Sequence, residues 1–247
     1  MGGTNRMLHV FYRHVHQKEE GRSRDPNKRR PEWFSYEKCF NNLLDTLENS
    51  SFGANVTLTV IYDGSEADFL TDFMYKYCAI PRKFKTYIKI APAGSNMKSW
   101  HVALDQARIA AIPDTDIIYF LENDYLHVPG WLDKVFELFS SEIRFDYLSL
   151  YDHMDKYFYP MYSELTAKLF VTPTHHWRST PSTCGTFMLR RKTLIEDLDL
   201  WAMEVQDHYL FTELCSNRGR VLLTPIPGLA THCMEGYLSP TIDWRHV

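Results

Sequence analysis

The sequence predicts an α/β protein with a mainly parallel central sheet flanked by helices, and three observations support this. Short apolar segments rich in β-branched and aromatic residues recur along the chain, as in IIYFL at 117–121, and are too short for helices. Segments with apolar residues at helical spacing lie between them, and this alternation is typical of βαβ units. The 247 residues, 45% of them hydrophobic, are enough for one large domain with a substantial core.

The first half of the chain follows this alternation element by element. It opens with a strand, MLHVFY at 7–12, and a polar loop from 13 to 33. The basic cluster Lys28-Arg29-Arg30 within that loop is interpreted as a solvated face. Ser35 is a plausible N-cap, because its hydroxyl can accept from backbone N–H groups of the first helical turn. The next expected elements are helix 35–50, strand 56–65 with Asp63 and a glycine turn at its end, helix 67–79, strand 85–92, helix 95–112 and strand 117–121.

The second half of the chain continues the pattern and then becomes less regular. A loop rich in Pro, Thr and Ser opens segment 172–198, and long loops in a compact domain are usually functional or mobile. Gly219 marks the end of a helix, since glycine readily adopts the left-handed backbone that terminates helices. The expected elements are helix 129–141, strand 145–152, strand 185–191, helix 205–219, strand 220–228 and an irregular tail at 229–244.

The composition disfavours two classes of partner. A net charge of -4 and a pI near 6.3 carry no signature of polyanion binding, so nucleic acid is not an expected partner. The first residues lack the apolar core of a signal peptide, and no run approaches the length of a membrane span. The five cysteines, an odd number without paired spacing, predict reduced thiols and a cytoplasmic location.

Acidic residues stand at the ends of three predicted strands: Asp63, the pair Glu122 and Asp124, and Asp152. In open α/β sheets, ligands bind where strands end at their carboxyl edge. Side chains two apart on an extended chain point the same way, so Glu122 and Asp124 are expected to share one face. Two like charges placed together repel unless a cation lies between them. The pattern therefore predicts a polar crevice for a sugar, a ribose or a metal-bound phosphate.

The motifs along the chain, in their order, resemble those of GT-A glycosyltransferases of the family 2 type. They are YDGS, GSNMKSWHVALDQA, IIYFLENDY, GTFMLRR, VQDHYLF and ATHCMEG, and the resemblance runs from about 7 to 232. It implies a single Rossmann-like GT-A domain over 1–247, in which residues to about 125 hold the donor nucleotide and the remainder shapes the acceptor site. It also implies transfer of a sugar from a nucleoside-diphosphate sugar, UDP first and GDP next, to a hydroxyl of a glycan or other acceptor.

The resemblance assigns the donor side to strand ends and to the start of one helix. A strand-end aspartate such as Asp63 contacts the nucleotide base, and the turn before Asn96 faces the ribose and the diphosphate. ENDY takes the place of the DxD motif, with Glu122 where an aspartate is usual. Two basic side chains are added because Arg13 follows the first strand and Lys98 lies where it can meet the diphosphate. The expected donor-binding residues are Arg13, Asp63, Asn96, Lys98, Glu122, Asn123 and Asp124.

The chemistry of sugar transfer calls for a divalent ion and a base. The departing diphosphate gathers negative charge, which Mg²⁺ or Mn²⁺ neutralises, and an imidazole ligand shifts the preference towards Mn²⁺. By resemblance, Asp124 and His232 are the metal ligands. Asp207 stands where the family carries its general base, although Gln206 precedes it where glutamate is common, and a base opposite the leaving group implies inversion. The acceptor contacts expected in nearby loops are Asp152, His153, His176 and Trp177.

Each assignment has a structural alternative, and two other functions stay open. Asp207 could cap a helix, His232 could be a hydrogen-bonded structural histidine, and Asp63 could be a turn former. A nucleotidyltransferase acting on sugar phosphates would share the sheet and the metal carboxylates, but it needs a glycine-rich phosphate loop where 13–33 holds one glycine. A non-catalytic zinc or sugar-binding module is the third hypothesis, suggested by eleven histidines and many aromatic residues.

Overall fold

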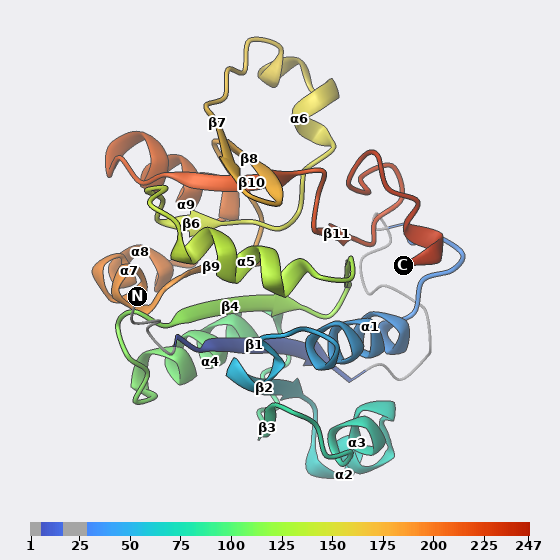
Figure 1. Ribbon diagram of the computed structural model, residues 1–247. Coiled ribbons are helices and arrows are strands. Elements are labelled where there is room, and N and C mark those ends of the chain that lie inside the picture. Colours follow the sequence, from blue (N-terminus) through green and yellow to red (C-terminus); the bar gives the residue numbers. More distant parts are fainter. Residues whose placement is uncertain (1–5, 17–28) are drawn as a thin grey trace.

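The computed structural model describes residues 6–16 and 29–247, which form a large sheet covered by helices on both faces (Figure 1). The strands are β1 Leu8–Val15, β2 Val56–Asp63, β3 Lys85–Ile90, β4 Ile117–Glu122, β5 Tyr125–His127, β6 Tyr147–Leu148, β7 Leu169–Thr172, β8 His175–Ser179, β9 Phe187–Arg190, β10 Leu222–Ile226 and β11 Ala230–His232. The helices are α1 Tyr36–Glu48, α2 Glu66–Thr71, α3 Phe73–Cys78, α4 Asn96–Ile109, α5 Trp131–Ser140, α6 Asp155–Phe158, α7 Arg191–Glu196, α8 Leu198–Trp201 and α9 Asp207–Thr212.

The main sheet has the strand order β3-β2-β1-β4-β9-β6-β10-β8-β7. In its first half β1 pairs in parallel with β2 and β4, and β2 pairs in parallel with β3. This confirms the predicted α/β class and places the carboxyl ends of these strands at one edge. Beyond β4 the sheet is mixed, because β9 runs antiparallel to both β4 and β6.

Helices cover the two faces of the sheet with separate hydrophobic cores. α1 and α5 pack on one face, against residues that include Val10 and Tyr12 of β1. α4, α7, α8 and α9 pack on the other face, against residues that include Phe11. Since successive residues of a strand point to opposite faces, Arg13 follows Phe11 onto the α4 face. The alternation of side chains along β1 therefore places Arg13 beside α4.

The helix expected at 67–79 and the strand expected at 145–152 differ from the structure. Residues 67–79, expected as one helix, form α2 and α3, because Asp72 ends the first and caps the second by accepting from the N–H of Met74. Residues 145–152, expected as one long strand, contribute only the two residues of β6 to the sheet. The N-cap expected at Ser35 is confirmed, since its hydroxyl accepts from the backbone N–H of Lys38.

The Pro-, Thr- and Ser-rich segment contains a strand where the sequence predicts a loop. β8 pairs antiparallel with β7 and with β10, so this expectation is wrong for His175–Ser179. The burial of Trp177 and the exposure of His176 show the alternation of a strand, but polar residue types conceal it in the sequence. The helix expected at 205–219 begins later, as α9, and continues through a π-helical turn, Glu213–Asn217, to Gly219, whose φ is +66°.

A small second sheet joins the tail of the chain to the segment that follows β4. β5 pairs antiparallel with β11, which places Tyr125 opposite His232. The backbone N–H of Cys233 donates to the carbonyl of Asp124 at 2.8 Å. The tail at 229–244, expected to be irregular, therefore begins with a strand, and this pairing fixes His232 beside the turn that follows β4.

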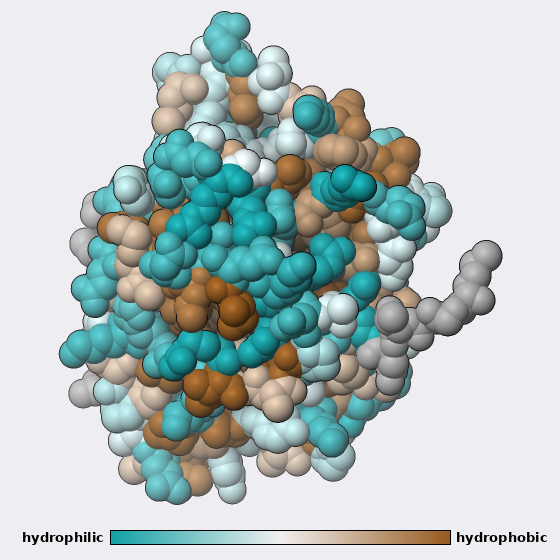
Figure 2. Space-filling view, turned by 90° about the vertical axis from the view of Figure 1, so that its left-hand side faces the viewer, coloured by the Kyte–Doolittle hydropathy of each residue, from teal (hydrophilic) through white to brown (hydrophobic). Residues whose placement is uncertain are grey.

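Several remaining expectations concern the ends and the surface of the chain. The basic loop predicted at 13–33 lies largely outside the described residues, although β1 extends through its first residues to Val15. All five cysteines are free thiols. No helix within 6–16 and 29–247 is long and apolar enough to cross a membrane. On the face shown in Figure 2, hydrophilic side chains predominate and hydrophobic ones form small separate patches.

His127, in β5, provides a test of the core through pH. Its imidazole is fully buried with Nε2 2.9 Å from the hydroxyl of Tyr119, and burial lowers its pKa from 6.5 to about 3. The unfolded chain binds this proton below about pH 6.5 and the folded chain does not, so stability falls as the pH drops through that value, by up to about 1.4 kcal/mol per pH unit. Urea unfolding between pH 6.5 and 5 should show a flatter dependence for His127→Gln than for the parent. Parallel curves would contradict the burial of a neutral imidazole.

Candidate functional site

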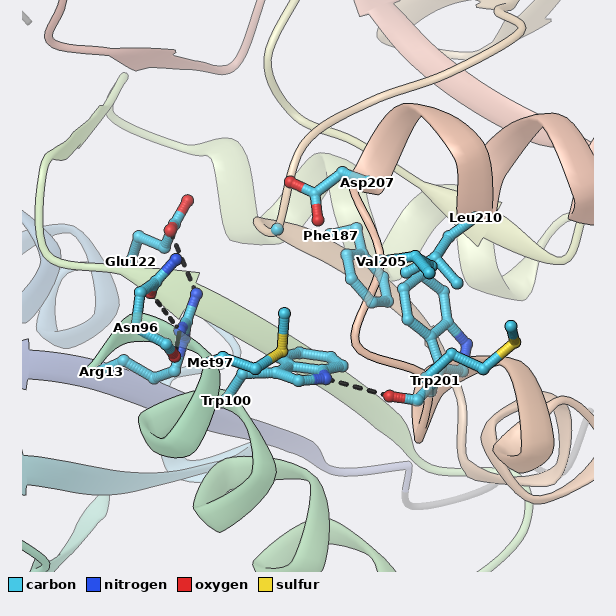
Figure 3. A pocket seen from close by; sticks show the side chains of 12 residues that line it. Arg13, Asn96, Met97, Trp100, Glu122, Phe187, Trp201, Val205, Asp207 and Leu210 are labelled. Carbon is cyan, nitrogen blue, oxygen red and sulfur yellow. Dashed lines mark hydrogen bonds and ion pairs between the residues drawn. The ribbon is translucent and has the colours of Figure 1, made fainter. Parts of the chain in front are cut away.

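Arg13 joins three elements at the carboxyl edge of the parallel strands. Its Nη2 donates to Glu122 Oε1 at 3.1 Å, and its Nη1 donates to Asn96 Oδ1 at 2.7 Å. Arg13 and Glu122 are register partners in the β1–β4 pair, so the sheet itself sets this ion pair. The guanidinium also lies over the ring of Trp100, 5.8 Å from its centroid. Figure 3 shows this group at one end of a pocket that continues towards α9.

Asp124 lies in a second cluster of charged groups, separate from the group around Arg13. Arg30 Nη2 donates to Asp124 Oδ2 at 2.6 Å, and His232 Nε2 lies 3.0 Å from the same oxygen. Arg30 Nη1 donates to the carbonyl of Cys233 at 2.8 Å. Burial works against the charge of Arg30, but the charge and hydrogen bond of Asp124, together with Tyr36, outweigh it and raise the pKa of Arg30 above its usual value. Each of the two strand-end carboxylates thus has a guanidinium of its own.

The interpretation of Lys28-Arg29-Arg30 as a solvated loop face is wrong for Arg30. Its side chain is 8% exposed, whereas Arg29 is exposed as expected. The guanidinium lies 4.9 Å from the ring centroid of Phe34, and its carboxylate partner is 94 residues away in the sequence. Sequence reasoning missed Arg30 because nothing local distinguishes it from its basic neighbour.

Asp207 lies at the junction of two pockets. The first is lined by Arg13, Asn96 and Glu122 at one end and by Asp207 at the other (Figure 3). A Cβ atom at Gly185 would lie 3.4 Å from Arg13 Nη2 and 3.7 Å from both Asp207 Oδ2 and Glu122 Cδ. Glycine at this position therefore keeps open the space in which the three charged groups converge. Sequence reasoning missed Gly185, because its role depends on neighbours from three separate elements.

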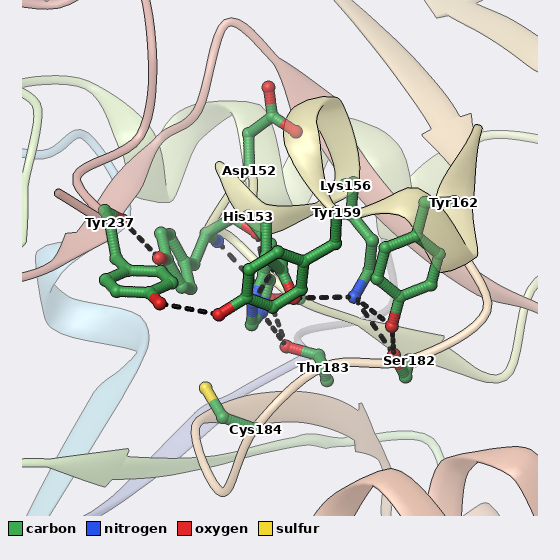
Figure 4. Close-up of polar contacts among 12 residues, drawn as sticks. Asp152, His153, Lys156, Tyr159, Tyr162, Ser182, Thr183, Cys184 and Tyr237 are labelled. Carbon is green, nitrogen blue, oxygen red and sulfur yellow. Dashed lines mark hydrogen bonds and ion pairs between the residues drawn. The ribbon is translucent and has the colours of Figure 1, made fainter. Parts of the chain in front are cut away.

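The second pocket lies on the other side of Asp207 and is lined largely by hydroxyl and imidazole groups. His153 Nε2 lies 2.8 Å from Thr183 Oγ1 (Figure 4). Lys156 Nζ donates to Ser182 Oγ at 3.1 Å and is 3.3 Å from the carboxylate of Asp155. Burial, followed by the charge of Lys156, holds the pKa of His153 well below its usual range, so its imidazole is neutral at physiological pH. This pocket brings the predicted base and one predicted acceptor residue together.

The position of Asp207 in its helix bears on its structural alternative. Asp207 is the first residue of α9, and Gln206 is the N-cap. The capping role considered for Asp207 is therefore not the one it has in this structure. A carboxylate in the first turn is still favourable near a helix N-terminus. Asp207 is exposed and lines both pockets.

Three further residues predicted for the donor side have different surroundings. Asp63, at the end of β2, accepts from the backbone N–H of Gly94 at 2.9 Å and so anchors the turn before α4. Lys98 is exposed in the first turn of α4. Asn123 points away from its acidic neighbours, with Nδ2 3.2 Å from His14 Nδ1.

The remaining predicted acceptor residues lie outside the pocket at Asp207. Both carboxylate oxygens of Asp152 are engaged within the protein, one by Arg178 Nη2 at 2.7 Å and the other by the hydroxyl of Tyr157 at 2.7 Å. Trp177 is fully buried and donates from Nε1 to Thr172 Oγ1. Their side chains therefore serve packing in β8 and beside it. His176 is exposed on the same strand.

Asp124 and His232 are within hydrogen-bond distance of each other, and the same spacing is compatible with two ligands of one divalent ion. Two ligand atoms bonded to one Mg²⁺ at about 2.1 Å and at a right angle lie about 3.0 Å apart. Asp124 Oδ2 and His232 Nε2 are 3.0 Å apart, and the imidazole is stacked on Tyr125, which fixes its orientation. No group of three or more His, Cys, Asp or Glu side chains suited to a metal occurs in the part of the chain that the structure describes. The protein would thus supply two ligands and leave the others to a bound molecule.

Comparison with solved structures confirms the fold. The crystal structure of S. aureus TarS 1–349 matches with a TM-score of 0.51 and 15% sequence identity, over 88% of this chain and 57% of that one. The same protein in complex with UDP gives a TM-score of 0.51 at 16% identity, with the same coverage. The chain has the GT-A-like fold of TarS. It spans little more than half the length of TarS 1–349.

Other comparisons add less. A protein of Desulfovibrio desulfuricans G20, provisionally named a nucleotide-diphospho-sugar transferase, matches with a TM-score of 0.47 at 11% identity, over 88% of this chain and 78% of that one. That similarity is too weak to add to the fold assignment. No family model and no curated protein sequence matches the chain.

The buried pair of Asp152 and Arg178 predicts a large effect on stability. Asp152→Asn would leave the guanidinium of Arg178 buried without its counter-charge, and we expect the free energy of unfolding to fall by about 3–5 kcal/mol. The matched control is Asp243→Asn, which breaks the exposed pair with Arg245 and should leave stability unchanged. Urea unfolding of the two variants would decide the matter. Equal, small effects would show that Asp152 is not a structural partner.

Proposed function

We propose that the chain is a metal-dependent, inverting glycosyltransferase. It would move a sugar from a nucleoside-diphosphate sugar, with UDP favoured over GDP, to a hydroxyl of a glycan or another acceptor. The observation that carries the proposal is the position of Asp207 between two pockets, one reaching the carboxyl edge of the parallel strands and one rich in hydroxyl groups. The GT-A-like fold shared with TarS, a protein crystallised with UDP, supports the first pocket as the donor side.

The donor side would use groups that the strand ends position. Ligands of open α/β sheets bind at this edge, where Asp63 holds the turn that leads into α4. Arg13 supplies a fixed positive charge beside Asn96 and Glu122. Glu122 keeps one oxygen on Arg13 and can offer hydrogen-bond acceptance to a ribose hydroxyl. Lys98, exposed at the start of α4, is free to approach a diphosphate from solvent.

Asp124 and His232 would hold the metal ion, whose charge neutralises the leaving diphosphate when it is bound. The mixed oxygen and nitrogen ligand pair favours Mn²⁺ over Mg²⁺. Diphosphate oxygens and water would complete the coordination, because within 6–16 and 29–247 no third His, Cys, Asp or Glu joins these two ligands. Donor and ion are therefore expected to bind together.

Asp207 would act as the general base. Its carboxylate faces the space around Gly185 on the donor side and also lines the hydroxyl-rich pocket. An acceptor hydroxyl in that pocket could pass its proton to Asp207 as it attacks the sugar. With the base and the diphosphate on opposite sides of the sugar, the displacement is single and inverts the anomeric centre.

The second pocket suits an acceptor that carries hydroxyl groups. Ser182 and Thr183 present hydroxyls, and the neutral imidazole of His153 can donate or accept a hydrogen bond. The charge of Lys156 is paired with the carboxylate of Asp155. The nucleotidyltransferase and zinc-module hypotheses gain no specific observation from the described residues.

Replacement of Asp124 tests the donor and metal proposal. Asp124→Asn keeps the shape but loses the negative charge, so UDP binding in the presence of Mn²⁺ should weaken by at least about tenfold. The melting temperature should also fall, because Arg30 loses its counter-charge, and binding should be measured by calorimetry well below it. The control is Asp105→Asn, an exposed residue of α4. Parental Mn²⁺-dependent affinity in Asp124→Asn would refute the metal assignment.

Replacement of Asp207 tests the chemical step. Asp207→Asn should retain UDP and Mn²⁺ affinity and stability, since the two side chains have nearly the same shape. Transfer should slow by about 10²–10⁴-fold, the usual contribution of a general base. Calorimetry beside a transfer assay, with the exposed Glu204→Gln as control, separates binding from chemistry. A parental rate in Asp207→Asn would leave the base unassigned.

A further inference from the structure

Arg30 covers both atoms that would hold the divalent ion. Its Nη2 donates to Asp124 Oδ2 at 2.6 Å, and its Nη1 lies 3.4 Å from His232 Nε2. The guanidinium therefore faces the carboxylate and the imidazole together. The contact is buried, with 8% of the Arg30 side chain and 7% of the Asp124 side chain exposed.

The electron pairs at this position cannot serve both cations. Asp124 Oδ2 already accepts from Arg30 and faces His232 Nε2. A carboxylate oxygen has two lone pairs but an imidazole nitrogen has one, so an ion bonded to Nε2 needs the electron pair that faces Arg30 Nη1 at 3.4 Å, on a nitrogen without a proton. A guanidinium held there would also repel a divalent cation. Arg30 and the ion therefore cannot hold Asp124 and His232 at the same time.

We propose that Arg30 and a divalent ion compete for Asp124 and His232, so that the ion binds only by displacing the guanidinium. This inference rests on the proposed function, because it takes Asp124 and His232 as the metal ligands. The arrangement keeps a buried carboxylate paired at all times, first by a side chain and then by the ion. It also makes ion binding weaker than the two ligands alone would allow.

Two other contacts of Arg30 would remain after it gives up Asp124. Its Nη1 donates to the carbonyl of Cys233, and the ring of Phe34 supports the guanidinium. Neither contact involves Asp124, so the guanidinium can keep part of its surroundings when it gives up the carboxylate. A released arginine beside a diphosphate has a suitable new partner, since guanidinium groups bind phosphate oxygens well.

The test compares Mn²⁺ binding in Arg30→Gln, Arg30→Lys and the exposed control Arg29→Gln. Free Mn²⁺ is measured by electron paramagnetic resonance during titration, with and without saturating UDP. We expect Arg30→Gln to bind Mn²⁺ about tenfold to a hundredfold more tightly than the parent, the range that one charge-assisted hydrogen bond accounts for. Arg30→Lys, which keeps the charge but cannot span both atoms, should fall between them, and Arg29→Gln should match the parent.

Thermal melting provides a second readout that does not depend on transfer. Without metal, Arg30→Gln should melt below the parent because buried Asp124 loses the charge of Arg30, and Mn²⁺ should raise its melting temperature more than it raises that of the parent. Equal or weaker Mn²⁺ affinity in Arg30→Gln overturns the inference. So does weaker UDP binding at unchanged Mn²⁺ affinity, which would make Arg30 a diphosphate contact only.

Asp124→Asn separates this inference from the proposed function. If Asp124→Asn loses Mn²⁺ binding while Arg30→Gln does not gain it, the displacement is wrong and the metal site stands. If Asp124→Asn binds Mn²⁺ as the parent does, the metal site itself is wrong and the inference falls with it.

Discussion

The arrangement of this protein depends on how two carboxylates at the end of one buried strand are neutralised. Glu122 and Asp124 lie at the carboxyl end of β4, where an unpaired charge would cost several kcal/mol. Two arginines from the first thirty residues, Arg13 and Arg30, neutralise these carboxylates. Each ion pair also joins elements that are distant in the sequence. Neutralising the two carboxylates therefore links several elements at this edge of the sheet.

The two arginines link different parts of the fold. Arg13 connects β1, β4 and the start of α4 through Glu122 and Asn96. Arg30 connects the segment before α1 with the turn after β4 and with the tail that carries His232. The first link is part of the sheet register and is rigid. The second lies outside the main sheet, where the Arg30 side chain is joined by a backbone hydrogen bond from Glu235 to the carbonyl of Arg29.

The mixed half of the sheet serves the site by bringing unrelated segments to Asp207. β9 is antiparallel to its neighbours, so Gly185, just before β9, lies at the same edge as the carboxyl ends of β1 and β4. β8 and its partners hold Trp177 and Arg178 in the core, and Arg178 neutralises Asp152. One buried ion pair thus lies in the mixed half of the sheet, while Asp207 is exposed where two pockets meet.

Much of the fold follows from local patterns in the sequence. The parallel strands, the N-cap at Ser35 and the strand-end positions of Asp63 and Glu122 could be predicted, because periodicity and capping chemistry act over a few residues. β8 could not, because its polar residues conceal a strand that only pairing with β7 and β10 stabilises.

The sequence by itself also determined which residue types the site would contain: strand-end carboxylates, a histidine in the tail and an aspartate before the last long helical segment. Only the tertiary structure decided which groups meet. Arg30 and Asp124 are 94 residues apart, and Asp124 and His232 are 108 apart. No local rule distinguishes Arg30 from Arg29, since the difference arises from a buried carboxylate that the folded chain brings to one of them. Long-range electrostatics is set by the fold, and so the identity of the cation at Asp124 could not be read from the sequence.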